Sequence, residues 1–224
     1  HLRNIMKKSP HIRCFPEFLR AAGYYCSNNE KEDYNFETPA SAWDESSNTA
    51  HWRNRKEGQS FYSVFNFMLT HQSQTRYLED ELIKRNAELP EALRHDPDNA
   101  MLPPYYPDTP NVRVNVAALH TQITLMDQAF QNILEELEND GLAEDTIVFF
   151  YGDHGDGLPR GKRWLHDTGM QVPLLIRFPE KYQHLAPAEP GDTVGELINF
   201  VDFAPTVLNL AGLRSPDYMQ GRAF

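Results

Sequence analysis

A long amphipathic segment leads directly into an uncharged, strand-like run, and this order constrains the fold more than any other feature. Over residues 112–139, apolar side chains recur at alternating spacings of three and four, which predicts one helix of roughly 40 Å. Residues 146–151 are mostly β-branched or aromatic and carry no charge, which predicts a buried strand. A coiled coil is the rival interpretation of the helix, but the following strand favours packing against a sheet.

The rest of the chain continues this alternation of helices and strands. Polar residues dominate positions 28–59, which predicts an ordered loop, and Cys26 in an adjacent strand is interpreted as a small core residue. Asp202 is placed to cap the last helix, and Gly212 to end it. The alternation predicts an α/β domain with a mostly parallel sheet sandwiched by helices. The further elements expected are helices over 15–22, 77–87 and 202–211, and strands over 24–27, 61–69 and 174–178.

Composition excludes some functions. The net charge of −11 argues against nucleic acid as a partner, because such binding depends on lysine and arginine neutralising phosphates. No apolar run is long enough for a membrane span. Two cysteines do not make a disulfide framework, and nothing in the sequence indicates an oligomeric state. Because the chain opens on His1 rather than methionine, we expect it to be a fragment, so a missing signal peptide carries no information.

Candidate site residues follow the strand of residues 146–151. Asp153 and His154 offer oxygen and nitrogen at its carboxyl end, where ligands bind in open α/β sheets, and together they would make half of a divalent metal site. The alternative is a capped turn without a ligand. Arg160, Lys162 and Arg163 gather beside this pair, and they indicate either an anion site or a solvated basic loop.

Several segments, taken in order, resemble the type I sulfatases of the alkaline phosphatase superfamily. Residues 15–25 look like the family's helix leading into a Gly-Tyr strand, and residues 65–71 look like its strand that ends in a histidine. Gly-Asp-His-Gly at 152–155, the lysine at 162 and the strand after Val172-Pro173 resemble its late metal-binding segment. Residues 201–212 resemble its downstream helix signature. The resemblance implies an incomplete sulfatase-like α/β fold, with 1–224 as a partial catalytic domain.

The resemblance also implies roles for particular residues. Metal ligation falls to Asp153 and His154, with Ca²⁺ as the expected cation. Catalytic roles at the sulfate and the leaving group fall to Lys31, Lys162 and His71, and substrate contacts to Arg163, His166 and Asp167. Each has a structural alternative: Lys31 as a surface lysine, His71 as the cap of a turn, and His154 as a hydrogen-bonded structural imidazole.

The sequence departs from the family pattern in two places. Lys31 is followed by Glu32-Asp33 instead of the usual Trp-His, and Cys14 is followed by Phe-Pro-Glu, without the arginine of the Cys/Ser-x-Pro-x-Arg motif. The formylglycine nucleophile that this motif supplies is therefore expected upstream, as are the family's paired aspartates. The C-terminal subdomain is likewise expected to be missing, and the fragment alone to be inactive.

The resemblance is greatest to bacterial heparan N-sulfatase-like members. It implies a sulfated glycan substrate carrying a sulfate ester or an N-sulfate, and a periplasmic or secreted location. Four aromatic residues would either stack on sugar faces or, as is more usual, pack internally: Trp43, Trp52, Tyr105 and Tyr106. Two alternatives remain: a phosphoesterase or phosphonate hydrolase of the same superfamily, and a non-catalytic glycan-binding relative.

Overall fold

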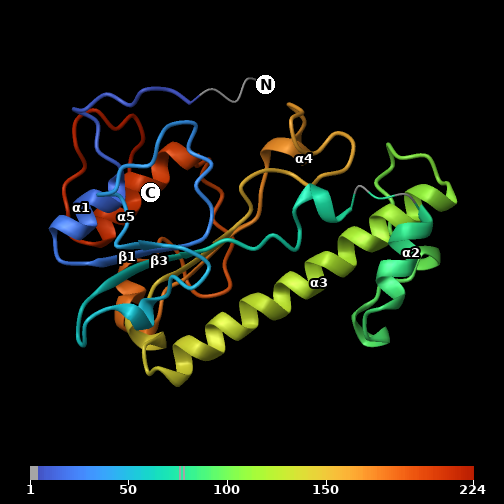
Figure 1. The fold of residues 1–224 in the computed structure, drawn as a ribbon, viewed down its shortest axis with the longest axis horizontal. Coiled ribbons are helices and arrows are strands. Elements are labelled where there is room, and N and C mark those ends of the chain that lie inside the picture. The colour runs from blue at the N-terminus through green and yellow to red at the C-terminus, as the bar shows by residue number, and fades with distance from the viewer. Residues whose placement is uncertain (1–4, 76, 78) are drawn as a thin grey trace. The chain divides into compact units, whose positions relative to one another are not determined.

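The computed structural model describes residues 5–75, 77 and 79–224 of the chain (Figure 1). These residues form two compact units, one made of the chain up to Asn66 together with Pro190–Phe224, and the other of Phe67–Glu189. The α/β class predicted from the alternation of elements is confirmed. The prediction that 1–224 is one partial catalytic domain stays a prediction. No helix of the described residues is both long and apolar enough to cross a bilayer.

The first unit is built on a three-stranded parallel sheet, β2–β1–β3. In register, Tyr25 pairs with Phe61 and Ser27 with Ser63, whose hydroxyl oxygens lie 2.8 Å apart. Two helices cover one face of β1 and β3 (Figure 1). The elements are α1 (Phe15–Ala21), β1 (Tyr25–Asn29), β2 (Glu45–Ser46), β3 (Phe61–Phe65) and α5 (Phe203–Leu210), with 3₁₀ turns at Trp52–Asn54 and Phe200–Asp202.

The core of this unit lies between the two helices and the sheet. Leu19 of α1, Cys26 of β1 and Leu208 of α5 are at most 1% exposed. Cys26 is thus the small core residue that was predicted, and burial raises the pKa of its thiol to about 12. Gly23 follows α1 with φ of +96°, a left-handed conformation that glycine adopts without steric cost. Helix α1 therefore turns back onto the sheet and closes the core.

Glu17 ties the first turn of α1 to the loop before β2. Its carboxylate accepts 2.6 Å hydrogen bonds from the backbone N–H of Cys14 and from the hydroxyl of Ser41. Burial opposes ionisation of this carboxyl group, but the two hydrogen bonds and the nearby positive charges outweigh it, so the pKa of Glu17 lies below its usual range. The helix start is therefore fixed by a charged, 7% exposed side chain.

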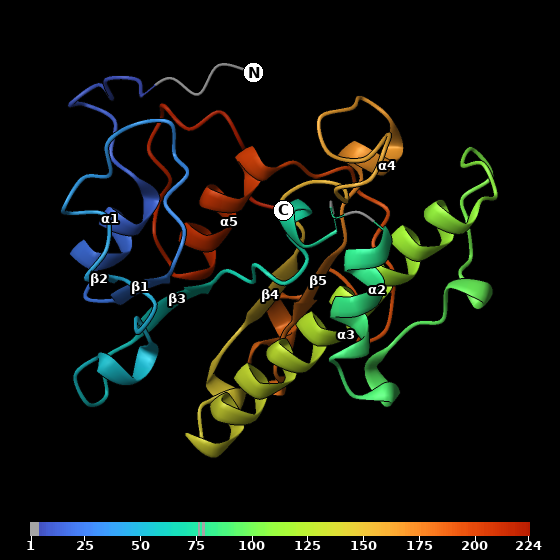
Figure 2. The same ribbon diagram turned by 45° about the vertical axis from the view of Figure 1, so that its right-hand side comes forward.

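The second unit is organised by the predicted long helix, α3 (Pro110–Asn139), which begins behind the cap Thr109. Its first half packs against α2, with Leu82 contacting Val114 and Ala118. Its second half runs beside the second sheet, β4–β5 (Figure 2). There the rings of Phe130 in α3 and Phe150 in β4 lie 4.8 Å apart. The other elements of this unit are α2 (Glu79–Ala87), β4 (Val148–Tyr151), α4 (Asp167–Met170) and β5 (Leu174–Arg177), with 3₁₀ turns at Gln72–Gln74, Glu91–Leu93, Pro97–Asn99, Ala143–Asp145 and Glu180–Leu185.

Contact with β4 favours the packed helix over the coiled coil, but the expected burial of that strand was wrong. Strand β4 is half-buried rather than buried, and Tyr151 is 40% exposed, because in the described residues β4 pairs only with β5, in antiparallel register. Ile123 in the apolar stripe of α3 is 42% exposed, because it lies between the part of the helix that α2 covers and the part that reaches β4.

The remaining differences concern ends of elements. Strand β3 stops at Phe65, four residues before its predicted end, because its partner β1 ends at Asn29; the backbone N–H of Asn66 makes the last bond, to the carbonyl oxygen of Asn29. Asp202 occupies the capping position of α5 as predicted, but its side chain accepts from the backbone N–H groups of Asn199 and Arg222 instead of capping that helix. Helix α2 begins at Glu79; residue 78 of its predicted range lies outside the described residues.

Candidate metal and anion site

Asp153 and His154 lie directly after β4, as the sequence predicts. The strand ends at Tyr151, Gly152 bonds back to the carbonyl of Pro173, and the chain then turns so that the two side chains face each other. The carboxylate oxygen Oδ2 of Asp153 and the ring nitrogen Nε2 of His154 are 3.4 Å apart. An oxygen and a nitrogen donor are thus brought together at the carboxyl end of the strand.

The second ring nitrogen of His154 determines what Nε2 can do. Nδ1 lies 2.8 Å from the carbonyl oxygen of Gly155, and because a carbonyl oxygen only accepts, Nδ1 must carry the proton. In a neutral ring, Nε2 then holds a lone pair that faces the carboxylate of Asp153. Two such acceptors repel each other unless a proton or a metal cation lies between them.

The spacing of the two acceptors fits one divalent cation. Two ligand atoms that are about 2.4 Å from one ion and at right angles lie about 3.4 Å apart. Within the described residues no group of three or more His, Cys, Asp or Glu side chains gathers that could hold a metal. Asp153 and His154 would therefore supply only two of the six to eight donors that a cation such as Ca²⁺ takes, and their ligation of a metal stays a prediction.

Three glycines hold the following loop in one shape. A Cβ on Gly155 would lie 1.9 Å from the carbonyl oxygen of Thr168, and one on Gly161 would lie 2.4 Å from that of Asp156. At Gly169 it would lie 2.3 Å from the carbonyl oxygen of Trp164. Backbone therefore packs directly on backbone across residues 155–169, which only glycine permits. The loop is rigid because its backbone segments pack against one another without room for a side chain.

Lys162 is presented by this packed loop. Its backbone N–H donates to the carbonyl oxygen of Asp156 at 2.7 Å, while the carboxylate of Asp156 accepts from the N–H of Leu158. The backbone hydrogen bond thus fixes the position of Lys162 relative to Asp153 and His154. The lysine itself is half-buried.

His71 lies in a turn that contacts the same loop. The N–H of Ser73 donates to Nδ1 of His71 at 3.2 Å, so the predicted capping alternative is real. Because Nδ1 accepts, the proton of the neutral ring resides on Nε2, which makes that atom a donor. Capping and proton donation are therefore compatible, because each uses a different ring nitrogen. The next residue, Gln72, donates to the carbonyl oxygen of Gly157 at 3.2 Å. This bond links the turn to residues 155–169, which directly follow the candidate metal ligands Asp153 and His154 and are called the metal-pair loop below.

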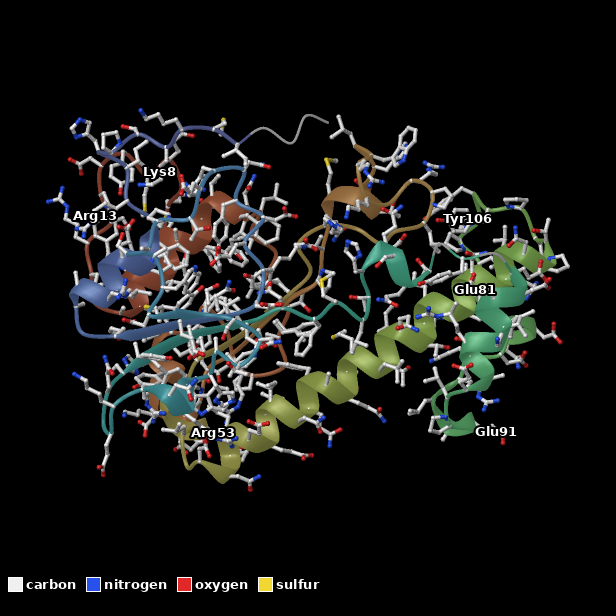
Figure 3. The ribbon with its side chains drawn as sticks, viewed as in Figure 1. Lys8, Arg13, Arg53, Glu81, Glu91 and Tyr106 are labelled. Atoms are coloured by element: carbon white, nitrogen blue, oxygen red, sulfur yellow. The ribbon has the colours of Figure 1, made fainter. Side chains whose placement is uncertain are left out.

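Tyr105 and Tyr106 support the loop from the side of the segment before α3 (Figure 3 labels Tyr106). The hydroxyl of Tyr106 donates to the carbonyl oxygen of Pro159 at 2.6 Å, and the guanidinium of Arg160 lies 4.5 Å from the ring centre of Tyr105. Burial and then the charge of Asp156 raise the pKa of Tyr106 to about 12, so its hydroxyl keeps its proton. The two tyrosines hold the loop in place.

The three predicted substrate contacts follow Lys162 on the exposed side of the loop. Arg163 has a left-handed backbone, with φ of +78°. His166 precedes α4, and its carbonyl oxygen accepts from Gly169 and Met170, while Asp167 is the first residue of that helix. All three are exposed to solvent. Their predicted contacts with substrate stay a prediction.

Lys31 belongs to the first unit, and its role at the site also stays a prediction. It follows the carboxyl end of β1, where its carbonyl oxygen accepts from the buried side chain of Asn28 at 3.2 Å. Together with Glu30, Glu32, Asp33 and Ser46 it lines an open polar pocket of about 530 Å³.

Two of the aromatic residues considered for sugar stacking have structural roles instead. Trp52 is 2% exposed, and Trp43 stacks on Tyr62 at 6.1 Å and donates from Nε1 to the hydroxyl of Tyr34. Trp52 is therefore not available to a glycan, and Trp43 is partly buried against the core of the first unit. Their position in a polar stretch of sequence did not reveal this burial.

Sequence reasoning missed three residues that shape the site: Gln72, Asp156 and Trp164. Gln72 and Asp156 act through backbone groups that become neighbours only after folding, so no pattern marks them. Trp164 could have been recognised from the sequence, because a tryptophan that follows Lys162 and Arg163 in a loop is not expected to lie in a hydrophobic core.

Known proteins are similar to this chain in sequence. The family profile described as Sulfatase matches residues 24–213. An ulvan-active sulfatase of Formosa agariphila is 44% identical over 95% of this chain, and an N-sulphoglucosamine sulphohydrolase of Homo sapiens is 32% identical over 55% of it. The chain spans 39% and 24% of the lengths of these relatives. Sulfatases generally use a metal ion and a formylglycine.

Solved structures agree on the fold. A Bacteroides thetaiotaomicron protein from work on the metabolism of multiple glycosaminoglycans has a TM-score of 0.66, at 22% identity over 94% of this chain and 56% of its own. A second structure, in complex with its substrate D-glucosamine-2-N,6-O-disulfate, has a TM-score of 0.62, at 17% identity over 95% and 63%. Because the profile covers most of the chain, this chain belongs to the sulfatase family.

Proposed function

We propose that the protein carrying this chain is a sulfatase that hydrolyses sulfate esters or N-sulfate groups of a sulfated glycan. The observation that carries the proposal is the pair of acceptors on Asp153 and His154, 3.4 Å apart, on the same rigid loop that presents Lys162. A cation and an anion-holding lysine beside each other are what sulfate transfer requires, because charge develops on the sulfuryl oxygens.

Asp153 and His154 would hold the cation, and Ca²⁺ is the ion we propose. When bound, a divalent cation polarises the sulfuryl group and stabilises an ionised nucleophile. The carboxylate of Asp153 is a hard donor that suits Ca²⁺, while the nitrogen of His154 is a donor more typical of transition metals. The identity of the ion therefore has to be measured.

The other residues act on the sulfate and on the leaving group. Lys162 places a point charge on a peripheral sulfate oxygen, and Lys31 does the same from the end of β1. His71 donates the Nε2 proton to the departing oxygen or nitrogen, and the bond from Ser73 keeps that proton on Nε2. Each role uses an atom whose charge or protonation follows from its chemistry or its backbone contacts.

The relatives support a polymeric, sulfated substrate. One acts on ulvan by its name, and the name of another specifies an N-sulfated glucosamine. An O-sulfated polysaccharide and an N-sulfated glucosamine at a chain end are therefore the two substrates to compare. Because such glycans lie outside the cell, we also propose a periplasmic or secreted location, which fractionation of the source cells tests.

The test measures inorganic sulfate released from ulvan oligosaccharides and from N-sulfoglucosamine by the full-length gene product, made in a host that forms formylglycine. Asp153→Asn and Lys162→Ala should each lower turnover by about 100-fold or more while leaving thermal unfolding unchanged. Lys181→Ala is the matched control, because Lys181 is an exposed lysine of the same unit, paired with Asp145.

Three results would contradict parts of the proposal. Near wild-type turnover by Asp153→Asn or Lys162→Ala would refute the site assignment. No sulfate release from either glycan, with hydrolysis of a phosphonate monoester instead, would identify the superfamily alternative. Loss of activity in EDTA that Zn²⁺ restores and Ca²⁺ does not would refute the proposed cation.

A further inference from the structure

Trp164 is a large apolar side chain that the structure leaves in solvent on a loop built to hold it there. The indole is 58% exposed, yet its backbone N–H donates to the carbonyl oxygen of Gly161, and its own carbonyl oxygen packs against Gly169. A mobile surface loop would not need two close backbone contacts around one exposed aromatic residue. The contacts fix where the indole projects.

The backbone on either side of Trp164 is held in an unusual conformation. Arg160 and Arg163 both have left-handed φ values, +70° and +78°, although neither is glycine. Such conformations cost free energy and persist where the surrounding structure enforces them, often at ligand sites. Here the carbonyl oxygen of Arg160 accepts from the hydroxyl of Thr168 at 2.8 Å, and Tyr106 holds the preceding residue.

Basic residues adjoin Trp164 in the sequence of an otherwise acidic chain. Lys162 and Arg163 directly precede Trp164, while the whole chain has a net charge of −11. The guanidinium of Arg160 lies on Tyr105, but Arg163 is exposed and has no hydrogen-bond or ion-pair partner among the described residues. The exposed indole of Trp164 can stack on the apolar face of a ring, and the neighbouring guanidinium of Arg163 can bind an anionic group on that ring.

We propose that Trp164 and Arg163 form a glycan subsite next to the sulfate-holding Lys162, with the indole stacking on a sugar ring and the guanidinium binding a carboxylate or second sulfate on it. The subsite rests on the proposed sulfatase function and specifies its substrate as at least a disaccharide with an acidic neighbouring sugar. The ring of His166 lies nearly parallel to the indole, with the ring centres 6.3 Å apart and the planes inclined by 20°.

A protein surface is the competing use of these side chains, and the neighbouring residue separates the two. Leu165 is 87% exposed and Met170 is 58% exposed, so a covering protein segment would bury Leu165 together with Trp164. A sugar ring stacked on the indole does not need Leu165. Leu165→Ala is therefore the matched control for Trp164→Ala.

The experiment compares kcat/KM for a sulfated disaccharide bearing a uronic acid with kcat/KM for p-nitrophenyl sulfate, using the full-length protein. In Trp164→Ala the ratio of the two should fall about tenfold through the KM of the disaccharide, and Trp164→Phe should restore most of it. Arg163→Ala should lower the ratio for the acidic disaccharide, but not for a disaccharide whose neighbouring sugar is neutral. Leu165→Ala should leave the ratio unchanged.

Equal losses on both substrates in Trp164→Ala would overturn the subsite and indicate a structural role. The same losses in Leu165→Ala and Trp164→Ala would overturn it in favour of a protein surface. Failure of the proposed function looks different, because the wild-type protein would then release sulfate from neither substrate.

Discussion

Gly155 allows the sharpest test of how the metal-pair loop is held. In Gly155→Ala the new Cβ would lie 1.9 Å from the carbonyl oxygen of Thr168 and 2.7 Å from Cα of Gly169. Ordinary contact begins near 3.4 Å, so the two backbone segments must separate by about 1.5 Å. Neither neighbour is the flexible end of a side chain. The strain must therefore move the segment that carries His154.

The effects of Gly155→Ala on stability and on turnover can be estimated. Overpacking of this kind costs roughly 1–3 kcal/mol, which lowers Tm by roughly 2–12 °C for a domain of about 150–250 residues. A 1 Å misplacement of a reacting group costs about 100-fold in rate, so we expect turnover to fall at least that far. Stabilisation by Ca²⁺ should also weaken, because Asp153 and His154 would no longer hold their two donor atoms 3.4 Å apart.

The assay is thermal unfolding of the full-length protein with and without added Ca²⁺, together with Ca²⁺ affinity by calorimetry. Gly195→Ala is the matched control, because no atom lies within 4 Å of an added Cβ there, and it should change neither quantity. Wild-type Tm and Ca²⁺ affinity in Gly155→Ala would refute the packing argument. A lower Tm with wild-type Ca²⁺ affinity would keep the packing but refute the metal pair.

Three further predictions follow from single hydrogen bonds. The pKa of Glu17 is lower in the folded state than in the unfolded state, so its ionised carboxylate stabilises the fold above the unfolded-state pKa, and this stabilisation is lost as the pH falls through the folded-state pKa. Glu17→Gln should therefore lower the free energy of unfolding by about 1–3 kcal/mol at pH 7 and by less near pH 3, as measured by urea unfolding. Tyr106→Phe removes the hydrogen bond to the carbonyl oxygen of Pro159, so it should lower kcat and leave Tm nearly unchanged, which paired kinetic and melting measurements check. Ser73→Ala keeps the backbone donor to His71 but removes the hydroxyl 2.8 Å from Nδ1, so kcat should fall less than tenfold, whereas equality with His71→Ala would refute the tautomer argument.

The sequence was sufficient for most of the fold because the signals for its elements are local. The apolar stripe of α3 and the glycines that follow α1, α3 and α5 define those helices within a few residues. Burial could not be read in the same way. The uncharged run of β4 looks like a strand covered on both faces, but how far it is covered depends on neighbours that the local pattern does not specify.

The candidate site was predictable where chemistry is carried by adjacent residues. Asp153 and His154 meet because they follow one another after a strand, so the motif itself contains the geometry. The contacts of Gln72 with Gly157 and of Tyr106 with Pro159 join positions 85 and 53 residues apart through backbone carbonyl groups. A backbone acceptor has no side-chain identity, and sequence reasoning therefore has nothing to recognise.

The two histidines show what the structure adds to a motif. Each was assigned a role from its place in the sequence, but a neutral imidazole either donates or accepts at Nε2, and sequence cannot say which. At His71 a backbone N–H meets Nδ1, so Nε2 carries the proton and is a donor. At His154 a backbone carbonyl meets Nδ1, so Nε2 of the neutral ring holds a lone pair and is suited to be a ligand. Opposite backbone partners thus suit the two histidines to the roles proposed for them, His154 to bind the cation and His71 to protonate the leaving group.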